Sequence, residues 1–239
     1  MRKRISIDQL KVGMKIEGEE GLKRAQIERH VEKSLARLKT DRIDLYQTHK
    51  DDADTPIDET LEALARLVKA GKVRAIGASN YSPERLRESL EASKRLNLPS
   101  YDTLQPEFNL YDRAGFEGGL QQVALEYGIA VIPFFALAKG FLSGKYRKAS
   151  DIEGRPRAGG LRKYFEGDRG MRILAALDAV GKRARATPAQ VSLAWLMAQP
   201  SIAAPIVSAT SVAQLDEIAA AARLKLDAAA LAELDRASR

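Results

Sequence analysis

The sequence predicts an α/β protein of the (β/α)8 TIM-barrel type that is incomplete, with five clear strands and a candidate sixth. Three observations lead to this prediction. Four short runs of apolar, β-branched and aromatic residues begin at positions 43, 73, 103 and 129, at intervals of 30, 30 and 26 residues. An interval of about 30 residues is the length of one strand–helix–strand unit. Helix start signals lie between these runs, and this alternation is typical of a parallel sheet covered by helices.

The strands are expected to be parallel neighbours in chain order, because strand–helix–strand crossovers within one sheet are almost always right-handed. They are predicted at Ile43–Gln47, Val73–Ala78, Thr103–Gln105, Ile129–Phe134 and Pro205–Val207. A sixth strand is a candidate near Val12–Ile16. Since a closed barrel of this type has eight strands, the predicted set leaves an open sheet.

The helices are predicted from their end signals. A hydroxyl residue at the N-cap followed by proline marks a helix start, and this pair occurs at Thr55–Pro56, Ser82–Pro83 and Thr187–Pro188. Gln190 completes a capping box with Thr187. The first of these helices carries an apolar stripe made of Leu61, Leu64, Ala65 and Val68, and Gly71 ends it. Two last helices are expected at about 212–222 and 227–237.

One segment interrupts the regular spacing. Residues 148–170 are rich in arginine, glycine and aspartate and have no apolar period, which is typical of a functional flap or a disordered stretch. The missing strands leave unpaired sheet edges. Three explanations stay open: the N-terminal segment pairs in place of the missing strands, two chains pair their open edges as a homo-oligomer, or the chain is a truncated fragment of a longer polypeptide.

Composition limits the classes of function. Of 239 residues, 45% are hydrophobic and 30% charged, as in a soluble globular protein with a sizeable core. No stretch is long and apolar enough to span a membrane, and no apolar signal region follows the basic N-terminus. Cysteine is absent, and only His30 and His49 offer imidazoles. We therefore expect no disulfide and no metal site, and the composition suits the cytoplasm.

The net charge of +7 has two interpretations. It can indicate an anionic partner, either nucleic acid or a phosphorylated small molecule, or it can be a solvated basic surface. Lysine and arginine are scattered along the chain, with no recognisable nucleic-acid motif and little aromatic interleaving. Nucleic-acid binding is therefore not expected.

Mostly polar residues, with one aromatic, stand at the ends of the predicted strands. They are His49, Ser79–Asn80, Gln105, Phe135–Ala136 and Ser208–Ser211. In parallel barrels, functional residues lie where strands end and the following loops begin, so these residues are expected to converge on one mouth. Each alone has a structural interpretation, such as a buried histidine, an N-cap turn or a core phenylalanine. Their occurrence at five successive strand ends favours a functional site.

Several long segments resemble the aldo-keto reductase family, in particular its bacterial branch. They read SLARLKTDRIDLYQTHKDD, GKVRAIGASNYS, LQPEFNLYDR, GIAVIPFFALAKGFLSGKYR and TPAQVSLAWLMAQPSIAAPIVSATSVAQLDE, in the order of the family. The resemblance runs from about Gly21 to the C-terminus. It implies a (β/α) barrel domain over residues 21–239, preceded by an atypical segment of uncertain origin at 1–20. The sequence of this first segment also resembles the opening of an unrelated bacterial signalling domain.

The resemblance also implies a chemistry, the NADPH-dependent reduction of aldehydes and ketones by hydride transfer. His49 matches the histidine that polarises the substrate carbonyl, a role that an imidazole N–H can perform. Ser79, Asn80 and Gln105 match the residues that hold the nicotinamide carboxamide. Phe135 falls where the family has a tyrosine that stacks on the nicotinamide ring.

Two later segments match the phosphate-binding parts of the family. The loop Ala136–Tyr146 matches the segment that closes over the pyrophosphate; its candidate contacts are Ala136, Leu137, Lys139, Gly140 and Lys145. The segment Ser208–Gln214 matches the pocket for the adenosine 2′-phosphate; its candidate contacts are Ser208, Ala209, Thr210, Ser211 and Gln214. Hydroxyls, backbone amides and a helix N-terminus all favour a bound anion.

The sequence departs from the family at its front. No segment resembles the first two strand–helix units, which carry an aspartate and the tyrosine that acts as general acid. The segment KVGMKI makes Lys15 the candidate catalytic lysine, although Met14 stands where the family usually has threonine or serine. Reductase activity is therefore expected to be impaired. The alternative hypothesis is a non-catalytic nicotinamide-nucleotide-binding module with a regulatory or scaffold role.

Overall fold

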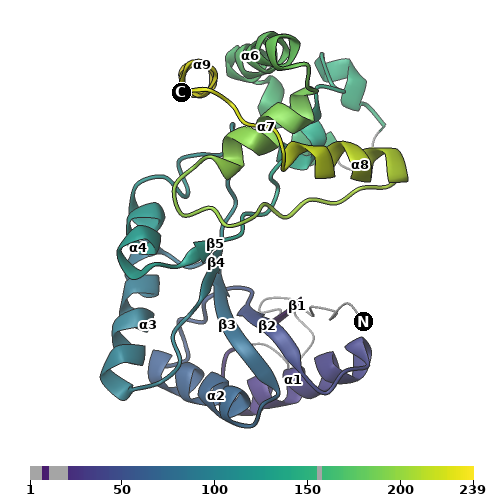
Figure 1. Ribbon diagram of the computed structural model, residues 1–239. Helices are drawn as coiled ribbons and strands as arrows, with labels where there is room; N and C mark the ends of the chain where they lie inside the picture. Colours follow the sequence, from purple (N-terminus) through teal and green to yellow (C-terminus); the bar gives the residue numbers. More distant parts are fainter. Residues whose placement is uncertain (1–6, 11–20, 155–157) are drawn as a thin grey trace. The chain divides into compact units, whose positions relative to one another are not determined.

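The computed structural model describes residues 7–10, 21–154 and 158–239, the first of these ranges by its backbone alone (Figure 1). The chain divides into two compact units. Unit 1 comprises Met1–Gln105 and Gly119–Ala130, and unit 2 comprises Pro106–Gly118 and Val131–Arg239.

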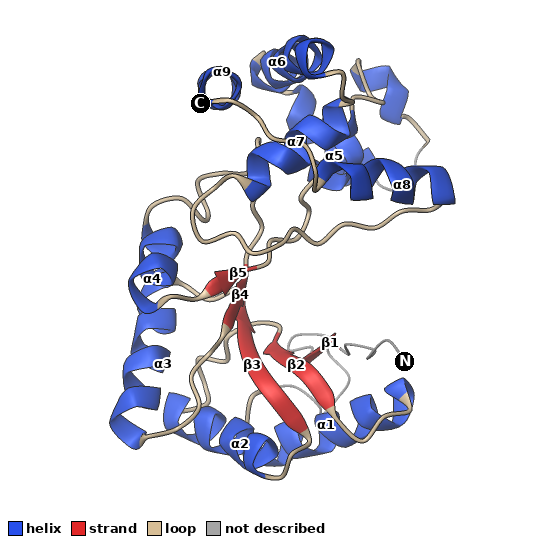
Figure 2. Ribbon diagram, viewed as in Figure 1, coloured by secondary structure: helices blue, strands red, loops and turns tan. Residues whose placement is uncertain are grey.

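The described residues contain a five-stranded sheet with the order β1-β2-β3-β4-β5 (Figure 2). Its strands are β1 (Ile7–Leu10), β2 (Ile43–Thr48), β3 (Val73–Ser79), β4 (Thr103–Gln105) and β5 (Ala130–Val131). The first four pair in parallel, each with the next along the chain. This confirms the predicted α/β class and the parallel order of the strands that begin at Ile43, Val73 and Thr103. The arrangement is consistent with an incomplete (β/α)8 barrel.

The last two predicted strands are shorter than expected or absent. Of the predicted strand Ile129–Phe134, only β5 is regular, and Phe134 forms a single parallel bridge with Glu107. The prediction of a strand at Pro205–Val207 is wrong, because this stretch has no regular ladder. Ile206 N still donates to Pro133 O at 2.9 Å. Proline has no N–H to donate, so Pro133 and Pro205 interrupt the ladder at these positions.

The N-terminal part adds a strand that was not among the predicted ones. β1 pairs in parallel with β2, in a register that sets Ile7 beside Leu45 and Leu10 beside Thr48. The candidate strand near Val12–Ile16 lies outside the described residues.

Four helices of unit 1 run along one side of the sheet (Figure 2). They are α1 (Arg24–Leu38), α2 (Ile57–Lys69), α3 (Pro83–Leu96) and α4 (Gly119–Tyr127). α2 buries Leu61 and Leu64 against the core, as its predicted stripe requires, and Gly71 follows its end with a φ of 71°. α3 begins as predicted, with the Ser82 hydroxyl accepting a hydrogen bond from Arg85 N.

The predicted cap of α2 is wrong. Its N-cap residue is Pro56, without a side-chain cap. The Thr55 hydroxyl donates instead to the Asp52 carboxylate. The helix begins at Ile57, so Thr55 lies one residue before the N-cap, and no helix N–H among the described residues donates to its hydroxyl.

Unit 2 consists mainly of helices. The longer ones are α6 (Arg169–Ala184), α7 (Pro188–Met197), α8 (Val212–Ala221) and α9 (Ala228–Ser238). α7 begins with the predicted capping box between Thr187 and Gln190. Phe108, Phe116 and Trp195 are fully buried, and the Phe108 ring lies 4.7 Å from Phe116 and 5.7 Å from Trp195, between centroids.

The segment predicted to be a flap or a disordered stretch contains short helical turns. They are η2 (Ala149–Ile152), α5 (Ala158–Leu161) and η3 (Arg162–Phe165). Three apolar or aromatic side chains of this segment, Ile152, Leu161 and Tyr164, are buried. Their spacing follows no helical or strand period, which is why the sequence pattern did not indicate structure here.

Candidate functional site

Three of the predicted site residues lie at strand ends in unit 1. In the register of the ladder, Gln47 pairs with Gly77, and Gly77 pairs with Thr103. Two residues further along, Ser79 pairs with Gln105, and His49 follows directly after the end of β2. Alternate residues of a strand face the same side, so Ser79 and Gln105 form a row above Gly77 and Thr103, and the backbone of His49 continues β2 beside this row.

Hydrogen bonds bring the four predicted residues of unit 1 together. The Ser79 hydroxyl donates to Gln105 O at 2.7 Å. The Asn80 side-chain amide donates to His49 O at 2.7 Å and to Ser79 Oγ at 3.1 Å. Asn80 adopts a left-handed φ of 54°, which asparagine tolerates better than most residues. Its side chain thereby connects the loop after β2 to the end of β3.

Access to solvent differs among these residues. Ser79 and Gln105 are buried, Asn80 is exposed, and His49 is intermediate. The Nδ1 atom of His49 is itself buried, and no described residue forms a hydrogen bond with it. The imidazole is therefore held with one nitrogen inside the protein.

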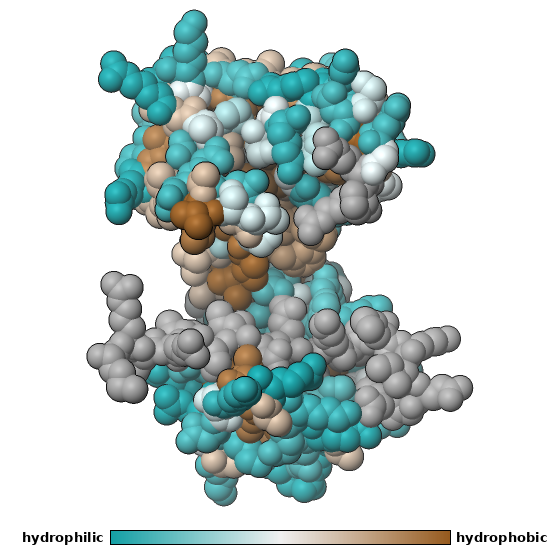
Figure 3. All heavy atoms as spheres, turned by 90° about the vertical axis from the view of Figure 1, so that its right-hand side faces the viewer, coloured by the Kyte–Doolittle hydropathy of each residue, from teal (hydrophilic) through white to brown (hydrophobic). Residues whose placement is uncertain are grey.

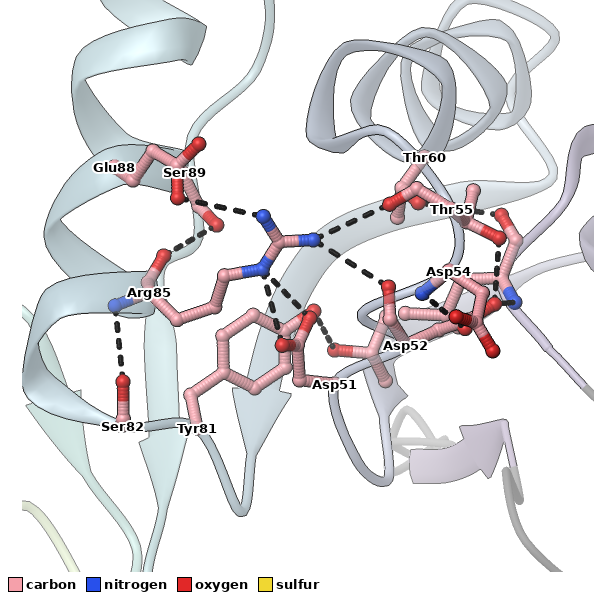
Figure 4. Close-up of polar contacts among 12 residues, drawn as sticks. Asp51, Asp52, Asp54, Thr55, Thr60, Tyr81, Ser82, Arg85, Glu88 and Ser89 are labelled. Carbon is pink, nitrogen blue, oxygen red and sulfur yellow. Dashed lines mark hydrogen bonds and ion pairs between the residues drawn. The ribbon is translucent and has the colours of Figure 1, made fainter.

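Arg85 holds the loop that follows His49 (Figure 4). Its Nε donates to both carboxylate oxygens of Asp51, at 2.9 and 3.0 Å. Another guanidinium nitrogen reaches Thr55 O at 3.2 Å and Asp52 O at 3.4 Å. Since Arg85 lies in the first turn of α3, these bonds attach the loop at 51–55 to the helix that follows β3.

Two tyrosines of unit 1 lie near the strand ends, but on the other face of the sheet. The Thr48 hydroxyl donates to Tyr81 Oη at 3.3 Å, and Tyr81 Oη lies 3.0 Å from Tyr101 Oη. Thr48 alternates with Gln47 in β2 and so points to the opposite face of the sheet from Gln47. Burial raises the pKa of both tyrosines above the ordinary value.

In unit 2, the predicted pyrophosphate loop has an unusual backbone. Phe135, Ala138 and Lys139 have left-handed φ angles of 51°, 47° and 57°. The Asn109 side-chain amide donates to Phe135 O at 3.1 Å. Phe135 is 43% exposed, and Lys139 Nζ lies 4.9 Å from its ring centroid. The loop therefore presents an aromatic ring to solvent with a cation above it.

The remainder of this loop is compact. Ala136 is buried and Leu137 intermediate, and η1 (Ala138–Ser143) follows directly. Gly140 has a φ of 96°, and a Cβ there would come within 3.1 Å of the Lys145 ammonium. A Cβ on Gly160 would come within 2.8 Å of Lys139 Nζ. Glycine at these two positions lets both lysines lie close to the backbone.

The predicted 2′-phosphate segment lies at the start of α8. Ser211 caps this helix by accepting from Gln214 N at 3.3 Å. The Gln214 side-chain oxygen accepts from Thr210 N at 2.9 Å and from Thr210 Oγ1 at 3.0 Å. Ser208, Thr210, Ser211 and Gln214 are exposed, and Ala209 is intermediate. The segment is thus a capped, accessible helix start.

Sequence reasoning missed a charged cluster in unit 2. Lys163 Nζ donates to Asp112 Oδ1 at 2.6 Å and lies 3.8 Å from Glu107 Oε1, while Tyr164 Oη donates to Asp112 Oδ2 at 3.1 Å. Burial and the neighbouring Asp112 charge raise the pKa of Glu107. Burial acts to raise the pKa of Asp112 too, but hydrogen bonds from Lys163, Asn109 and Tyr164 lower it overall. The charges of PEFNLYDR, directly after β4, were the available signal.

Two further predictions concern the candidate catalytic lysine and membrane-spanning segments. Lys15 lies outside the described residues. Within the ranges that the structure covers, no helix has the length and apolar character needed to cross a membrane.

Comparison with known proteins identifies the family. Residues 2–239 match the Aldo/keto reductase family. The chain is 29% identical over 212 residues to L-glyceraldehyde 3-phosphate reductase of Escherichia coli K12. This match covers 86% of this chain and 61% of that protein. It is 34% identical over 209 residues to the uncharacterized oxidoreductase YrpG of Bacillus subtilis, with 87% and 62% covered.

A longer match involves Protein tas of Escherichia coli K12, which is 30% identical over 243 residues, covering 92% of this chain and 68% of that protein. The chain spans about three fifths of the length of the first two relatives. The family match, over residues 2–239, includes β2 to β4. The chain belongs to the Aldo/keto reductase family.

Proposed function

We propose that this chain binds NADPH and reduces the carbonyl group of a small aldehyde or ketone. The observation that supports this most directly is the set of His49, Ser79, Asn80 and Gln105, joined by hydrogen bonds at the ends of three adjacent parallel strands. Family membership supports the same reaction class. The substrate would be a small molecule, and the protein would act in the cytoplasm.

NADPH, when bound, supplies a hydride to the carbonyl carbon and leaves as NADP⁺. His49 would donate a hydrogen bond to the carbonyl oxygen, on which negative charge develops. Ser79, Asn80 and Gln105 would hold the nicotinamide carboxamide, for which hydroxyl and amide groups supply both donors and acceptors. The resulting alkoxide then needs a proton.

The source of that proton limits the activity that we propose. Tyr81 and Tyr101 are buried, their hydroxyls bond to each other, and burial raises their pKa. Neither is therefore suited to protonate an alkoxide beside His49. Loss of a general acid costs about 10²–10⁴-fold in rate. We propose that turnover is impaired by this factor, with Lys15 as the candidate lysine of the site.

The cofactor assignment extends to unit 2 residue by residue. Phe135 would stack on the nicotinamide, and Lys139 and Lys145 would face phosphate charge. Ala136, Leu137 and Gly140 would contribute backbone contacts. Ser208, Ala209, Thr210, Ser211 and Gln214 would surround the 2′-phosphate at the start of α8, where the helix dipole favours an anion. This favours NADPH over NADH.

One set of samples tests binding and chemistry separately. NADPH and NADH are titrated by nicotinamide fluorescence, and turnover of an aromatic aldehyde is followed by nicotinamide absorbance. We expect NADPH to bind at least several-fold more tightly than NADH, and turnover to fall well below about 10 s⁻¹, a typical enzyme value. His49→Gln should abolish the remaining turnover and leave NADPH binding nearly unchanged.

The other histidine of the chain supplies the matched control, since His30 lies in α1, away from the strand ends. His30→Gln should leave both signals unchanged. NADPH binding without any turnover would favour the non-catalytic nicotinamide-binding module instead. Equal affinity for the two cofactors would count against the 2′-phosphate assignment. Turnover near 10 s⁻¹ that depends on His49 would show that a general acid is present.

A further inference from the structure

Gln47 lies two residues before His49 and crosses the sheet toward β4. Its side chain is fully buried, and its Oε1 accepts a hydrogen bond from Thr103 Oγ1 at 3.1 Å. Gly77 separates the two residues in the ladder. A Cβ on Gly77 would come within 2.1 Å of Thr103 Oγ1 and 3.0 Å of Gln47 Cγ. The glycine therefore makes room for this bond and fixes the direction of the Gln47 amide.

Two buried nitrogen atoms in this part of unit 1 have no hydrogen-bond partner among the described residues. They are Gln47 Nε2 and His49 Nδ1. A buried polar group without a partner destabilises the folded protein, so such groups are normally satisfied by protein or by an ordered water. The two atoms are chemically complementary. The amide nitrogen can only donate, and Nδ1 of a neutral imidazole can accept.

The two residues are neighbours in the chain, because Gln47 lies in β2 and His49 follows directly after the end of that strand. Residues two apart in an extended chain lie roughly 6.6 Å apart. Two buried polar atoms that find no partner in the described residues are suited to be bridged by one ordered water. The other histidine of the sequence, His30, lies in α1 and not beside Gln47 in β2.

We propose that Gln47 is a positioning residue that sets the tautomer of His49. Its amide N–H donates to one bridging water, which in turn donates to His49 Nδ1 and thereby keeps the imidazole proton on Nε2. Thr103 orients Gln47 by donating to its Oε1, so the chain of donors runs from Thr103 through Gln47 to His49. The consequence for catalysis rests on the proposed function: Nε2–H is then the donor that meets the carbonyl oxygen.

The tautomer can be read directly by NMR. The full chain is labelled with ¹⁵N-histidine in a His30→Gln background, which leaves His49 as the single imidazole. Long-range ¹H–¹⁵N spectra of the neutral ring distinguish the Nε2–H form from the Nδ1–H form. We expect the Nε2–H form to dominate by about two- to tenfold, the ratio that one hydrogen bond of ordinary net strength supports.

Gln47→Glu is the decisive variant, because it keeps the shape of the side chain and replaces the donor by an acceptor. A carboxylate accepts a hydrogen bond from Nδ1–H and cannot donate one, so the dominant tautomer should invert. Thr103→Val is a second variant, which removes the orienting hydroxyl and should reduce the tautomer ratio without inverting it. Gln122→Glu, on the exposed side of α4, adds the same charge elsewhere and should change nothing.

Failure of this inference is distinguishable from failure of the proposed function, because the spectra require neither cofactor nor substrate. An Nε2–H form that persists in both Gln47→Glu and Thr103→Val would overturn the role of Gln47, even if His49 supports turnover. A tautomer that inverts in an inactive protein would uphold the role of Gln47 and count against the proposed reaction alone.

Discussion

At the scale of single residues, Asp52 organises the loop that carries His49. Its Oδ2 accepts from Leu22 N at 2.8 Å and from the Thr55 hydroxyl at 2.5 Å, and its Oδ1 accepts from Asp54 N at 3.1 Å. Burial acts to raise the pKa of Asp52, but the bonds from Thr55, Leu22 and Asp54 outweigh it and hold the pKa below the ordinary value.

Asp52→Asn tests this carboxylate. A group whose folded-state pKa is lowered stabilises the protein above its unfolded pKa of about 4, and that contribution is lost as the pH falls through the folded pKa. We expect the variant to be less stable by roughly 1–2 kcal/mol at pH 7, because the hydrogen bonds lose their charged acceptor. The difference should shrink below about pH 4. Urea unfolding at several pH values measures it.

The neighbouring Asp54 is the matched control, since its side chain is exposed and only its backbone N–H contacts Asp52. Asp54→Asn should change the free energy of unfolding by less than about 0.5 kcal/mol at every pH. A difference between wild type and Asp52→Asn that stays constant from pH 7 to pH 3 would mean that the charge of Asp52 contributes nothing.

At the scale of residues, the strand spacing predicted where some side chains lie, while their roles stay a prediction. His49, Ser79 and Gln105 lie at or directly after strand ends, as expected, because parallel strands end at the same edge of a sheet. The predicted cap failed at the start of α2, where Thr55 lies one residue before the N-cap and its hydroxyl donates to Asp52. Gln47 was not predicted as a site residue, because a glutamine inside an apolar strand gives no periodic signal. Its importance comes from Gly77, which only the ladder register places beside it.

At the scale of elements, the residues of η3 are attached to the loop after β4. Lys163 and Tyr164 both donate to Asp112, and Lys163 O accepts from the Tyr111 hydroxyl at 2.8 Å. The Tyr164 ring also stacks on Phe141 of η1, with centroids 4.9 Å apart. These contacts, rather than any local helix propensity, explain why the segment is structured. Sequence periodicity cannot reveal contacts of this kind.

Lys163→Met should release this segment. The Lys163 side chain is 41% exposed, so losing its ion pairs should cost only about 1 kcal/mol of local stability. Local opening would then be about fivefold more populated, and thermolysin should cut between residues 149 and 165 about fivefold faster. Timed digestion followed by mass spectrometry measures the rate and the cleavage sites.

Arg162 lies beside Lys163 in the same turn and is exposed, which makes Arg162→Met the matched control. It removes an equal charge and should leave the cleavage rate unchanged. If both variants are cut at the same rate as wild type, the aromatic contacts of Tyr164 hold the segment without the ion pair.

At the scale of the whole molecule, the alternation of strands and helices could be predicted from the sequence. How the sheet continues at its two ends could not. The parallel order β2-β3-β4 follows from the regular spacing and from right-handed crossovers. β1 escaped prediction because its pairing depends on an edge that the regular strands leave free. The second half of the chain was harder, since Pro133 and Pro205 remove donors from otherwise strand-like sequences.

On the face drawn in Figure 3, the coloured residues are mostly hydrophilic, and some apolar residues lie among them. Within unit 2, three exposed apolar residues come from one stretch of chain: Val212 is 75% exposed, Leu215 56% and Ile206 43%. Val212 and Leu215 are three residues apart on α8 and therefore share one face of the helix. Single exposed apolar residues are common, but a pair on one helix face favours association.

If two chains associate through this face of α8, the dimer fraction should rise with protein concentration in sedimentation velocity experiments. Burying a valine or leucine contributes about 1.5–3 kcal/mol, so Val212→Asp and Leu215→Asp should each weaken the dimer by about tenfold or more. Leu125→Asp, at a 53% exposed site on α4, introduces the same change in unit 1 and should leave the association unchanged. If the dimer weakens equally in all three variants, its interface is not confined to α8. If wild type stays monomeric at every concentration, the apolar face of α8 does not drive self-association.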